Sequence, residues 1–182
     1  NLLSITGASA TSWNSVTITS ANTDTSLVAT GLIDGGYLTY AVDAGGNLSA
    51  ASSNTVTIDT TAPTVTLAAS AATSTSATIT FTVTGNEAIT CSTLSTTSGT
   101  DFTLTNISAL TGIVQTSSMV CTVTATSTAL ADGVAVVSTL TAAGSFSMTD
   151  TAGNAQATLT GSPQTITVTI AAVTTTTAAP VP

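Results

Sequence analysis

The chain has 182 residues, with no lysine, arginine or histidine and eight acidic residues, so its net charge is −8 and its isoelectric point is near 4.1. Proteins hold nucleic-acid phosphates and anionic membranes mainly through Lys and Arg, so this composition argues against both as partners. The chain also lacks the imidazole and ammonium groups that most often act as catalytic bases, which argues against an enzyme.

Residues 1–60 predict a short or incomplete immunoglobulin-like β-sandwich. Threonine or serine alternates with apolar residues, a period of two that is typical of half-buried antiparallel strands. The alternating stretches are 2–6, 15–19, 37–42 and 54–59, with Gly- and Asp-containing turn signals between them. About five strands can be recognised, whereas an immunoglobulin-like sandwich has about seven, so we expect a strand from elsewhere to complete this domain, in cis or in trans.

The large aromatic residues of this first domain are Trp13, Tyr37 and Tyr40. Aromatic side chains can form a flat platform for carbohydrate, but in a chain with so few of them they serve first as core anchors. We therefore expect all three in the core.

The stretch from Asp59 to Pro63, DTTAP, separates two regions of alternating sequence. Proline lacks a backbone donor and interrupts strand pairing, so this stretch is suited to a linker. It predicts two sandwiches joined end to end. The expected fold class is therefore all-β, with tandem immunoglobulin-like antiparallel β-sandwiches.

Residues 61–172 predict a complete sandwich of this type, because the region has about the length that the fold requires. The clearest strands are expected at 64–67, 77–84, 119–126 and 164–170, with turn signals between them and no helical period. The alternation is lost over 173–182, which contain two prolines, so an extended Thr- and Pro-containing tail is expected there. No apolar run approaches the ~20 residues that a membrane-spanning helix needs, so we expect no membrane insertion.

Cys91 and Cys121 are the two cysteines of the chain. Both share the phase of apolar neighbours in alternating sequence, Phe81 and Ile89 for the first and Met119 and Val123 for the second. Inward-facing thiols at an even count favour a disulfide, with two buried free thiols as the alternative. Two cysteines without histidine make a poor zinc site.

An internal repeat relates 40–59 to 146–170, since both read as strand, Asp-x-x-Gly-Asn turn and final strand. Asp43 and Asp150 hold equivalent places in these turns, and Asp59 lies at the junction. Carboxylates near a domain boundary suit weak calcium binding. The alternative is that these aspartates only cap turns by accepting backbone N–H groups. No other cofactor is expected.

The motifs VTIDTTAPTVTL at 56–67, YAVDAGGN at 40–47 and MTDTAGN at 148–154, with FTVTGNEAI and DFTLTN within 81–106, resemble the bacterial Ig-like domain repeats of large secreted adhesins and biofilm-associated surface proteins. The resemblance covers about 40–170. It implies tandem sandwiches in an extracellular, cell-surface stalk or layer, without enzymatic activity. Members of that family usually contain Lys and often lack Cys, so the departures point to an unusual branch, such as a polymeric fibre.

The sequence therefore predicts a structural module of a secreted bacterial cell-surface fibre, stalk or layer, whose partners are neighbouring Ig-like domains and further copies in a polymer. Strand sharing could build the polymer, with residues 165–173 as the donor. The alternative is an adhesive module that recognises a glycan or host surface through sandwich-end loops such as 92–100. Glu87 and Asp101 could suggest a glycosidase pair, but both lie in turn-like segments without a sugar cleft.

Overall fold

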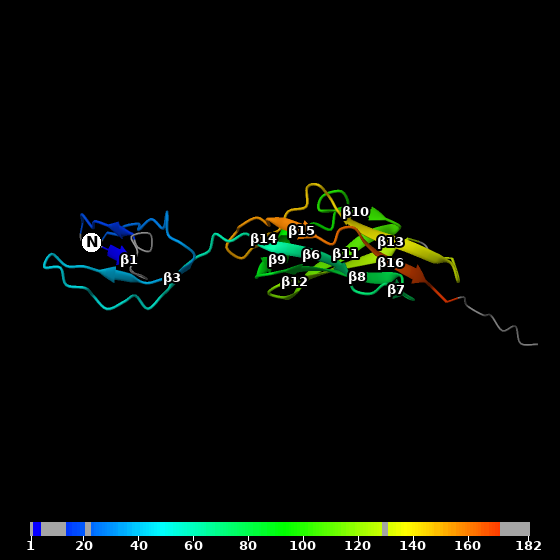
Figure 1. Ribbon diagram of the computed structural model, residues 1–182, viewed down its shortest axis with the longest axis horizontal. Coiled ribbons are helices and arrows are strands. Elements are labelled where there is room, and N and C mark those ends of the chain that lie inside the picture. The colour runs from blue at the N-terminus through cyan, green and yellow to red at the C-terminus, as the bar shows by residue number, and fades with distance from the viewer. Residues whose placement is uncertain (1, 5–13, 21–22, 129–130, 172–182) are drawn as a thin grey trace, which may run out of the picture. The chain divides into compact units, whose positions relative to one another are not determined.

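The computed structural model describes residues 2–4, 14–20, 23–128 and 131–171, and these are all-β (Figure 1). The chain divides into two compact units, Asn1–Thr61 and Ala62–Pro182. This boundary lies one residue after the one predicted from the DTTAP stretch. The Thr- and Pro-containing tail predicted at 173–182 lies outside the described residues.

The first unit contains two small antiparallel sheets, one with the strand order β2-β1-β4 and one that pairs β3 with β5. Their bounds are β1 Leu2–Ser4, β2 Ser15–Val16, β3 Gly35–Tyr37, β4 Thr39–Ala41 and β5 Val56–Ile58. Strands β2, β4 and β5 are shorter than the alternating stretches 15–19, 37–42 and 54–59 that predicted them. Alternation determines the face on which a side chain would lie, but it does not supply a partner strand, so the strands end where pairing ends.

The first unit has little core. Among its described side chains, Tyr37 is the one large apolar group that is fully buried, and its hydroxyl donates to the carbonyl of Ile33 at 2.8 Å. The core position predicted for Tyr37 is confirmed, Tyr40 is only partly buried, and Trp13 lies outside the described residues. Large apolar side chains remain exposed here, namely Ile18, Val28, Ile33, Leu48 and Val56.

The second unit is built from two larger sheets and one short strand pair. The five-stranded sheet has the order β11-β12-β8-β6-β15, the four-stranded sheet has the order β10-β13-β16-β7, and β14 pairs with β9. Most pairs are antiparallel, but β15 runs parallel to β6 and β16 parallel to β7. The bounds are β6 Thr64–Ala69, β7 Thr73–Ser74, β8 Thr78–Gly85, β9 Ile89–Thr90, the 3₁₀ helix η2 Cys91–Thr93, β10 Phe102–Thr105, β11 Ile107–Ser117, β12 Val120–Ser127, β13 Ala135–Ala142, β14 Thr149–Asp150, β15 Thr158–Thr160 and β16 Gln164–Thr169.

The core of the second unit lies between its two large sheets, which is the arrangement of a β-sandwich. Strand β8 shows how the sequence builds it, because Ile79, Phe81 and Val83 are buried while the threonines between them face outward. One continuous cluster combines residues of both sheets with Ile89 of β9 and with Phe146 and Met148 from the segment between β13 and β14. Phe102 and Phe146 meet edge to face, with ring centroids 5.5 Å apart.

The long edge strand β11 is interrupted by three bulges. Its register against β12 skips Ser108, Thr111 and Thr116. Each of these residues donates its side-chain hydroxyl to a β12 carbonyl, those of Thr126, Thr124 and Val120 at 3.0, 3.4 and 3.3 Å. Bulges make an edge a poorer template for another chain, and here serine and threonine preserve a hydrogen bond at each interruption.

Strand β16 is paired on both edges, with β13 on one side and β7 on the other. The sequence-based prediction that residues 165–173 act as a donor strand has to be weighed against this pairing. The residues of β16 already complete the four-stranded sheet of their own unit, and donating them would open its core.

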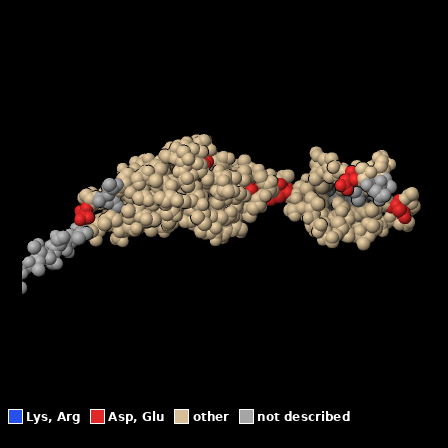
Figure 2. Space-filling view, turned by 180° about the vertical axis from the view of Figure 1, so that it is seen from behind, with Lys and Arg blue, Asp and Glu red and all other residues tan. Residues whose placement is uncertain are grey.

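The visible surface carries little charge, and its acidic side chains are few (Figure 2). Across the described ranges, no helix is long and apolar enough to cross a membrane.

Candidate functional site

The same hydrogen-bonded turn occurs in both units, at Asp43–Asn47 and at Asp150–Asn154. In each, the aspartate N–H donates to the asparagine carbonyl at 3.1 Å. The aspartate carboxylate accepts the asparagine backbone N–H at 2.8 Å in both units, and the asparagine side-chain amide at 2.8 Å in the first and 2.7 Å in the second. Gly46 and Gly153 have φ values of 86° and 99°, so the fourth position requires glycine.

The two turns differ in burial. Asp43 is exposed, whereas Asp150 is only 2% exposed. Burial alone would raise the pKa of Asp150, but hydrogen bonds from the Asn154 side chain and from backbone amides, including that of Gly153 at 2.6 Å, outweigh it, and the pKa lies below its usual value. The Asn47 side-chain amide likewise lowers the pKa of Asp43. Both aspartates therefore act as charged turn caps.

We expect Asp150→Asn to destabilise the second unit by about 1–2 kcal/mol at neutral pH, because a buried carboxylate that accepts several N–H groups is lost. The folded-state pKa is lowered, so the stabilisation is complete above the unfolded pKa of about 4 and is lost as the pH falls through the folded value. The variant should therefore lose less stability on acidification than the parent protein. Urea unfolding between neutral pH and pH 3 measures this difference.

The matched control is Asp43→Asn, which makes the same change in the exposed copy of the turn. It should have a smaller effect, because water can replace the lost hydrogen bonds. Equal losses for the two variants, or an unchanged acid response in Asp150→Asn, would contradict the role assigned to burial.

The end of the first unit is held by an aspartate that the sequence did not single out. Asp34 accepts the N–H and hydroxyl of Thr60 at 2.8 and 2.6 Å and the hydroxyl of Thr61 at 2.5 Å, and these bonds lower its pKa. Asp59 accepts the N–H of Thr61 at 3.1 Å. The two threonines of the DTTAP stretch thus donate hydrogen bonds to Asp34. The contact of Asp59 is a turn-capping hydrogen bond, the role that the sequence analysis gave as the alternative to calcium binding.

In the second unit, a pair of carboxylates comes together through strand pairing. Strand β14 pairs with β9 with Asp150 opposite Ile89, and the Thr90 hydroxyl donates to the Asp150 carbonyl at 3.0 Å. This brings a carboxylate oxygen of Glu87 within 4.8 Å of one of Asp150. Two like charges at this separation repel each other, and a cation between them would relieve the repulsion. Asp43 belongs to the other unit.

The pair fits weak calcium binding rather than a tight site, because Ca²⁺ prefers six to eight oxygens. We expect a Kd on the order of 10⁻⁴–10⁻³ M, the range of extracellular modules. At 1 mM Ca²⁺ this would stabilise the second unit by about 0.4–1.4 kcal/mol. Melting of the full chain with Ca²⁺ and with chelator measures the effect, and Glu87→Gln should abolish it. A large loss of stability with chelator would show a stronger site.

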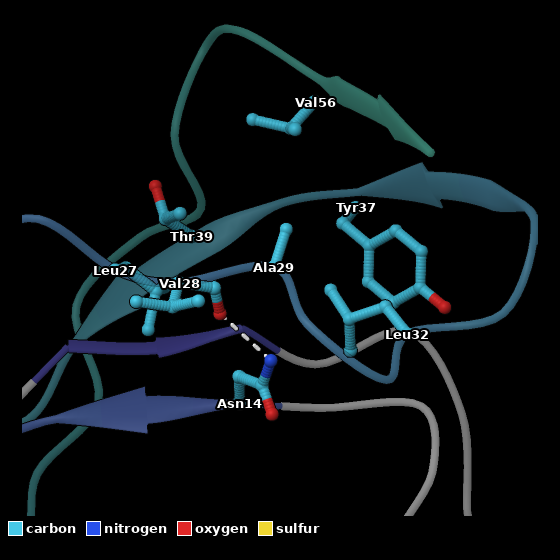
Figure 3. A pocket seen from close by; sticks show the side chains of 8 residues that line it. All are labelled: Asn14, Leu27, Val28, Ala29, Leu32, Tyr37, Thr39 and Val56. Carbon is cyan, nitrogen blue, oxygen red and sulfur yellow. Dashed lines mark hydrogen bonds between the residues drawn. The ribbon is translucent and has the colours of Figure 1, made fainter. Parts of the chain in front are cut away.

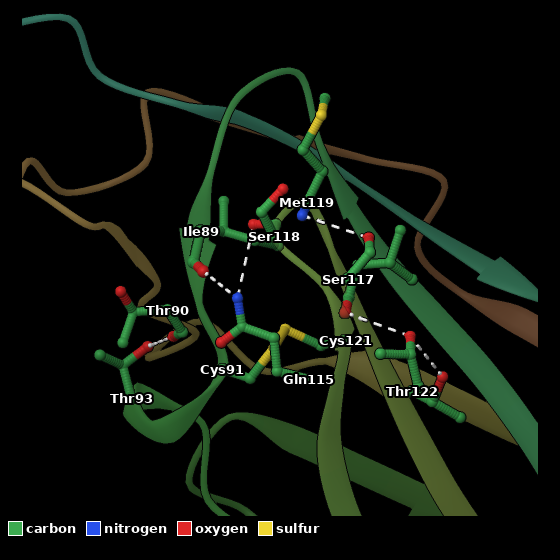
Figure 4. The surroundings of a disulfide bond; sticks show 12 residues. Ile89, Thr90, Cys91, Thr93, Gln115, Ser117, Ser118, Met119, Cys121 and Thr122 are labelled. Carbon is green, nitrogen blue, oxygen red and sulfur yellow. Dashed lines mark hydrogen bonds between the residues drawn. A yellow bond between two sulfur atoms is a disulfide. The ribbon is translucent and has the colours of Figure 1, made fainter.

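Cys91 and Cys121 form a disulfide, the pairing that the sequence favours, with sulfur atoms 1.99 Å and Cα atoms 5.7 Å apart (Figure 4). Both cysteines are buried, Cys91 at the start of η2 and Cys121 in β12. The bond joins the segment after β9 to the five-stranded sheet. Beside it, the Gln115 side chain donates to the Ile89 carbonyl at 2.8 Å. Met119, predicted to face inward with Cys121, is instead 38% exposed in the turn before β12.

Asp101, which the sequence analysis considered together with Glu87, has a clear set of structural contacts. It is 4% exposed and accepts the N–H groups of Ser95 at 2.7 Å and Ser147 at 3.3 Å. Its own carbonyl accepts the N–H of Ala143 at 2.8 Å. Asp101 therefore fastens the 92–100 loop to the segment after β13.

No family model, no curated protein and no solved structure matches this chain. What the site can do is therefore inferred from its own contacts. These are two equivalent capped turns, one pair of carboxylates and one disulfide, and none of them contains a nucleophile beside a base.

Sequence reasoning located the two turn aspartates and the cysteines because each belongs to a local pattern. It missed Asp34 and the nearness of Glu87 to Asp150. The repeat of the Asp-x-x-Gly-Asn motif was the available signal for the turns. For the Glu87–Asp150 pair no local signal exists, because the pairing of β9 with β14 joins residues 60 positions apart.

Proposed function

We propose that this chain is a structural module of a secreted bacterial cell-surface fibre, stalk or layer, built from immunoglobulin-like β-sandwiches in tandem. The observation that carries the proposal is the recurrence of one turn, with the same hydrogen bonds, in two separate units. Repetition of a module along a chain is how extended surface proteins gain length.

The composition and the disulfide also support the proposal. A chain without Lys or Arg offers no cleavage position to trypsin-like proteases, which is useful outside the cell. Disulfides form and persist mainly in oxidising compartments such as the cell exterior. The outward-facing residues of β8 and β12 are mostly threonine, which keeps the surface of the five-stranded sheet polar without charge.

Electron microscopy of the purified chain, at rising concentration and in native surface material, tests this role. We expect ordered filaments or sheets, and antibody labelling on intact source cells. Monodisperse single particles at all concentrations, together with labelling confined to lysed cells, would contradict it.

The adhesive alternative relies on the 92–100 loop, which is largely exposed. The loop is made of Ser, Thr and Gly with Leu94 as its large apolar residue, and Leu94 is buried. Glycan sites generally use aromatic side chains, which are absent from this loop. The structural role is therefore favoured, and binding of the full chain to a glycan array would reverse that preference.

A further inference from the structure

The first and last strands of the second unit lie side by side and run in the same direction. Strand β15 is parallel to β6, with Thr158 opposite Thr64. Strand β16 is parallel to β7, with Thr167 opposite Thr73. The first pair belongs to the five-stranded sheet and the second to the four-stranded sheet. The segments that begin and end the unit therefore cross from one sheet to the other together.

Further hydrogen bonds join these two segments outside the paired residues. Before β15, the N–H of Ala157 donates to the Pro63 carbonyl at 2.8 Å. At the end of β6, the N–H of Ala69 donates to the side-chain oxygen of Gln164 at 3.0 Å. We call this continuous contact the terminal seam, and its two sides are residues 63–74 and 157–168.

The two backbones approach each other most closely at Gly161, where the last segment changes sheets. Gly161 has a φ of 77°, and a Cβ atom at this position would overlap the carbonyl oxygen of Leu67. Beside it, the hydroxyls of Thr66 and Thr160 lie 3.0 Å apart. A larger residue at position 161 would therefore push the two sides of the seam apart.

The parallel direction decides how the seam responds to tension along the chain. The chain enters the second unit at the start of β6 and leaves it after β16, at opposite ends of the sandwich (Figure 1). Tension therefore pulls the two segments past each other along their length, and all the hydrogen bonds between them are loaded together. If these segments were antiparallel, both would be pulled at the same end, and their hydrogen bonds would open one after another.

Sliding of the seam would also disturb the core. Val65 and Leu67 of β6 and Ile166 and Val168 of β16 are fully buried in the core that both large sheets share. Because a close-packed core has few voids, these side chains cannot move in opposite directions without losing their contacts. Packing and hydrogen bonds therefore resist the pull at the same time.

The described part of the first unit has a different arrangement. Each of its described strand pairs is antiparallel, and its first and last described strands, β1 and β5, belong to different sheets. It also contains an apolar cavity of about 170 Å³ (Figure 3). Open space removes packing contacts. The side chains around the cavity include Leu27, Val28, Leu32, Tyr37 and Val56.

We propose that the second unit is a tension-resisting element, in which a pull along the chain shears the terminal seam, and that it stays folded at forces that extend the first unit. The resistance is a property of the fold, and only its use in a fibre, stalk or layer rests on the proposed function.

Single-molecule stretching of the full chain, attached at its two ends, tests this proposal. The step of the second unit is identified because reduction of its disulfide lengthens that step by about 100 Å. We expect this step to follow that of the first unit. Forced unfolding is governed by the unfolding rate, so the rate at constant force is the quantity to compare.

A second attachment changes the direction of the pull. It replaces the C-terminal attachment by one at Thr151, an exposed turn residue beside β14. Asp150 pairs with Ile89, close to Gly85, which pairs with Val65 at the start of β6, so both pulling points then lie at the same end of the seam. The seam should now open from that end, and the second unit should unfold about tenfold faster or more at the same force.

A matched pair of glycine variants tests the seam itself. Gly161→Ala should speed unfolding about tenfold or more under end-to-end tension, and much less with the attachment at Thr151. The control is Gly99→Ala, because Gly99 also has a positive φ, of 87°, but a Cβ atom there would meet open space. Its effect should be small and the same in both directions of pull.

Three results would overturn the proposal: equal unfolding rates for the two attachments, a second unit that unfolds before the first, or equal effects of the two glycine variants. The comparison of attachments uses the parent protein, so it stands even if Gly161→Ala does not fold. Absence of filaments in electron microscopy would contradict the proposed function and leave the seam intact. Filaments together with equal rates for the two attachments would contradict the seam alone.

Discussion

Reduction of the Cys91–Cys121 disulfide is expected to lower the free energy of unfolding of the second unit by about 3–4 kcal/mol, because the bond closes a loop of 30 residues and restricts the unfolded chain. That is a large share of the ~5–15 kcal/mol by which a domain is normally stable. Urea unfolding with and without reductant, followed by hydrogen exchange at the amides of the second unit, measures the change.

The same bond has a mechanical consequence that bears on the proposed role. A polypeptide extends at most about 3.3–3.6 Å per residue, so the disulfide keeps about 100 Å of chain from being pulled out when the second unit unfolds under force. Single-molecule stretching should therefore show a contour-length gain about 100 Å shorter for the oxidised protein than for the reduced protein. A module that carries tension benefits from this limit.

The control is the double variant Cys91→Ala with Cys121→Ala, which should behave like the reduced protein and be insensitive to reductant. Equal stability of the oxidised and reduced forms would contradict the prediction. A variant that still responded to reductant would show that the reagent acts somewhere other than this bond.

The strands that the sequence located best are those in which alternation and pairing coincide. Residues 77–84 predicted β8 almost to its ends, because threonine faces solvent and Ile79, Phe81 and Val83 face the core along its whole length. The prediction for β16 was equally close. In these strands the local pattern and the tertiary environment agree, which is the condition under which local reasoning succeeds.

Strands β11 and β13 are long, but their sequences do not show the regular alternation of apolar and polar residues from which a strand is predicted. Strand β11 loses the period of two wherever a bulge inserts an extra residue, so its apolar positions fall out of phase. Strand β13 begins with Ala-Val-Val, in which Val137 is exposed and Ser138 is buried, the reverse of what polarity suggests. Ser138 is buried because its hydroxyl lies 2.8 Å from that of Ser127 and donates to the Asn106 carbonyl at 3.0 Å. That network depends on tertiary contacts.

The alternation of apolar and polar residues also predicts burial wrongly when it extends beyond the end of a strand. Met119 continues the alternation of β12, but it lies in the turn before Val120 and is exposed. In the first unit the alternation of apolar and polar residues is present, but the neighbouring strands that would bury its apolar side chains are not seen in the described residues. Val56 has the phase of a core residue, yet the described part of the unit supplies no strand to cover it. A sequence reports which side chains could be buried, and the presence of a partner decides which of them are.

That distinction gives a matched pair of substitutions, Ile166→Ala and Val56→Ala, at equivalent positions of the two last strands. Ile166 is 2% exposed in a core shared by both sheets, so its truncation should cost about 2–5 kcal/mol through lost transfer free energy and a residual cavity. Val56 is 50% exposed, so its truncation should change the stability of the first unit by about 0.5 kcal/mol or less.

Denaturant unfolding monitored by hydrogen exchange, read separately at β5 and β16, distinguishes the two costs within one chain. We expect the midpoint of the second unit to fall markedly in Ile166→Ala and that of the first unit to stay nearly constant in Val56→Ala. Equal and large costs for the two substitutions would mean that Val56 is covered in the folded protein, which would contradict this prediction.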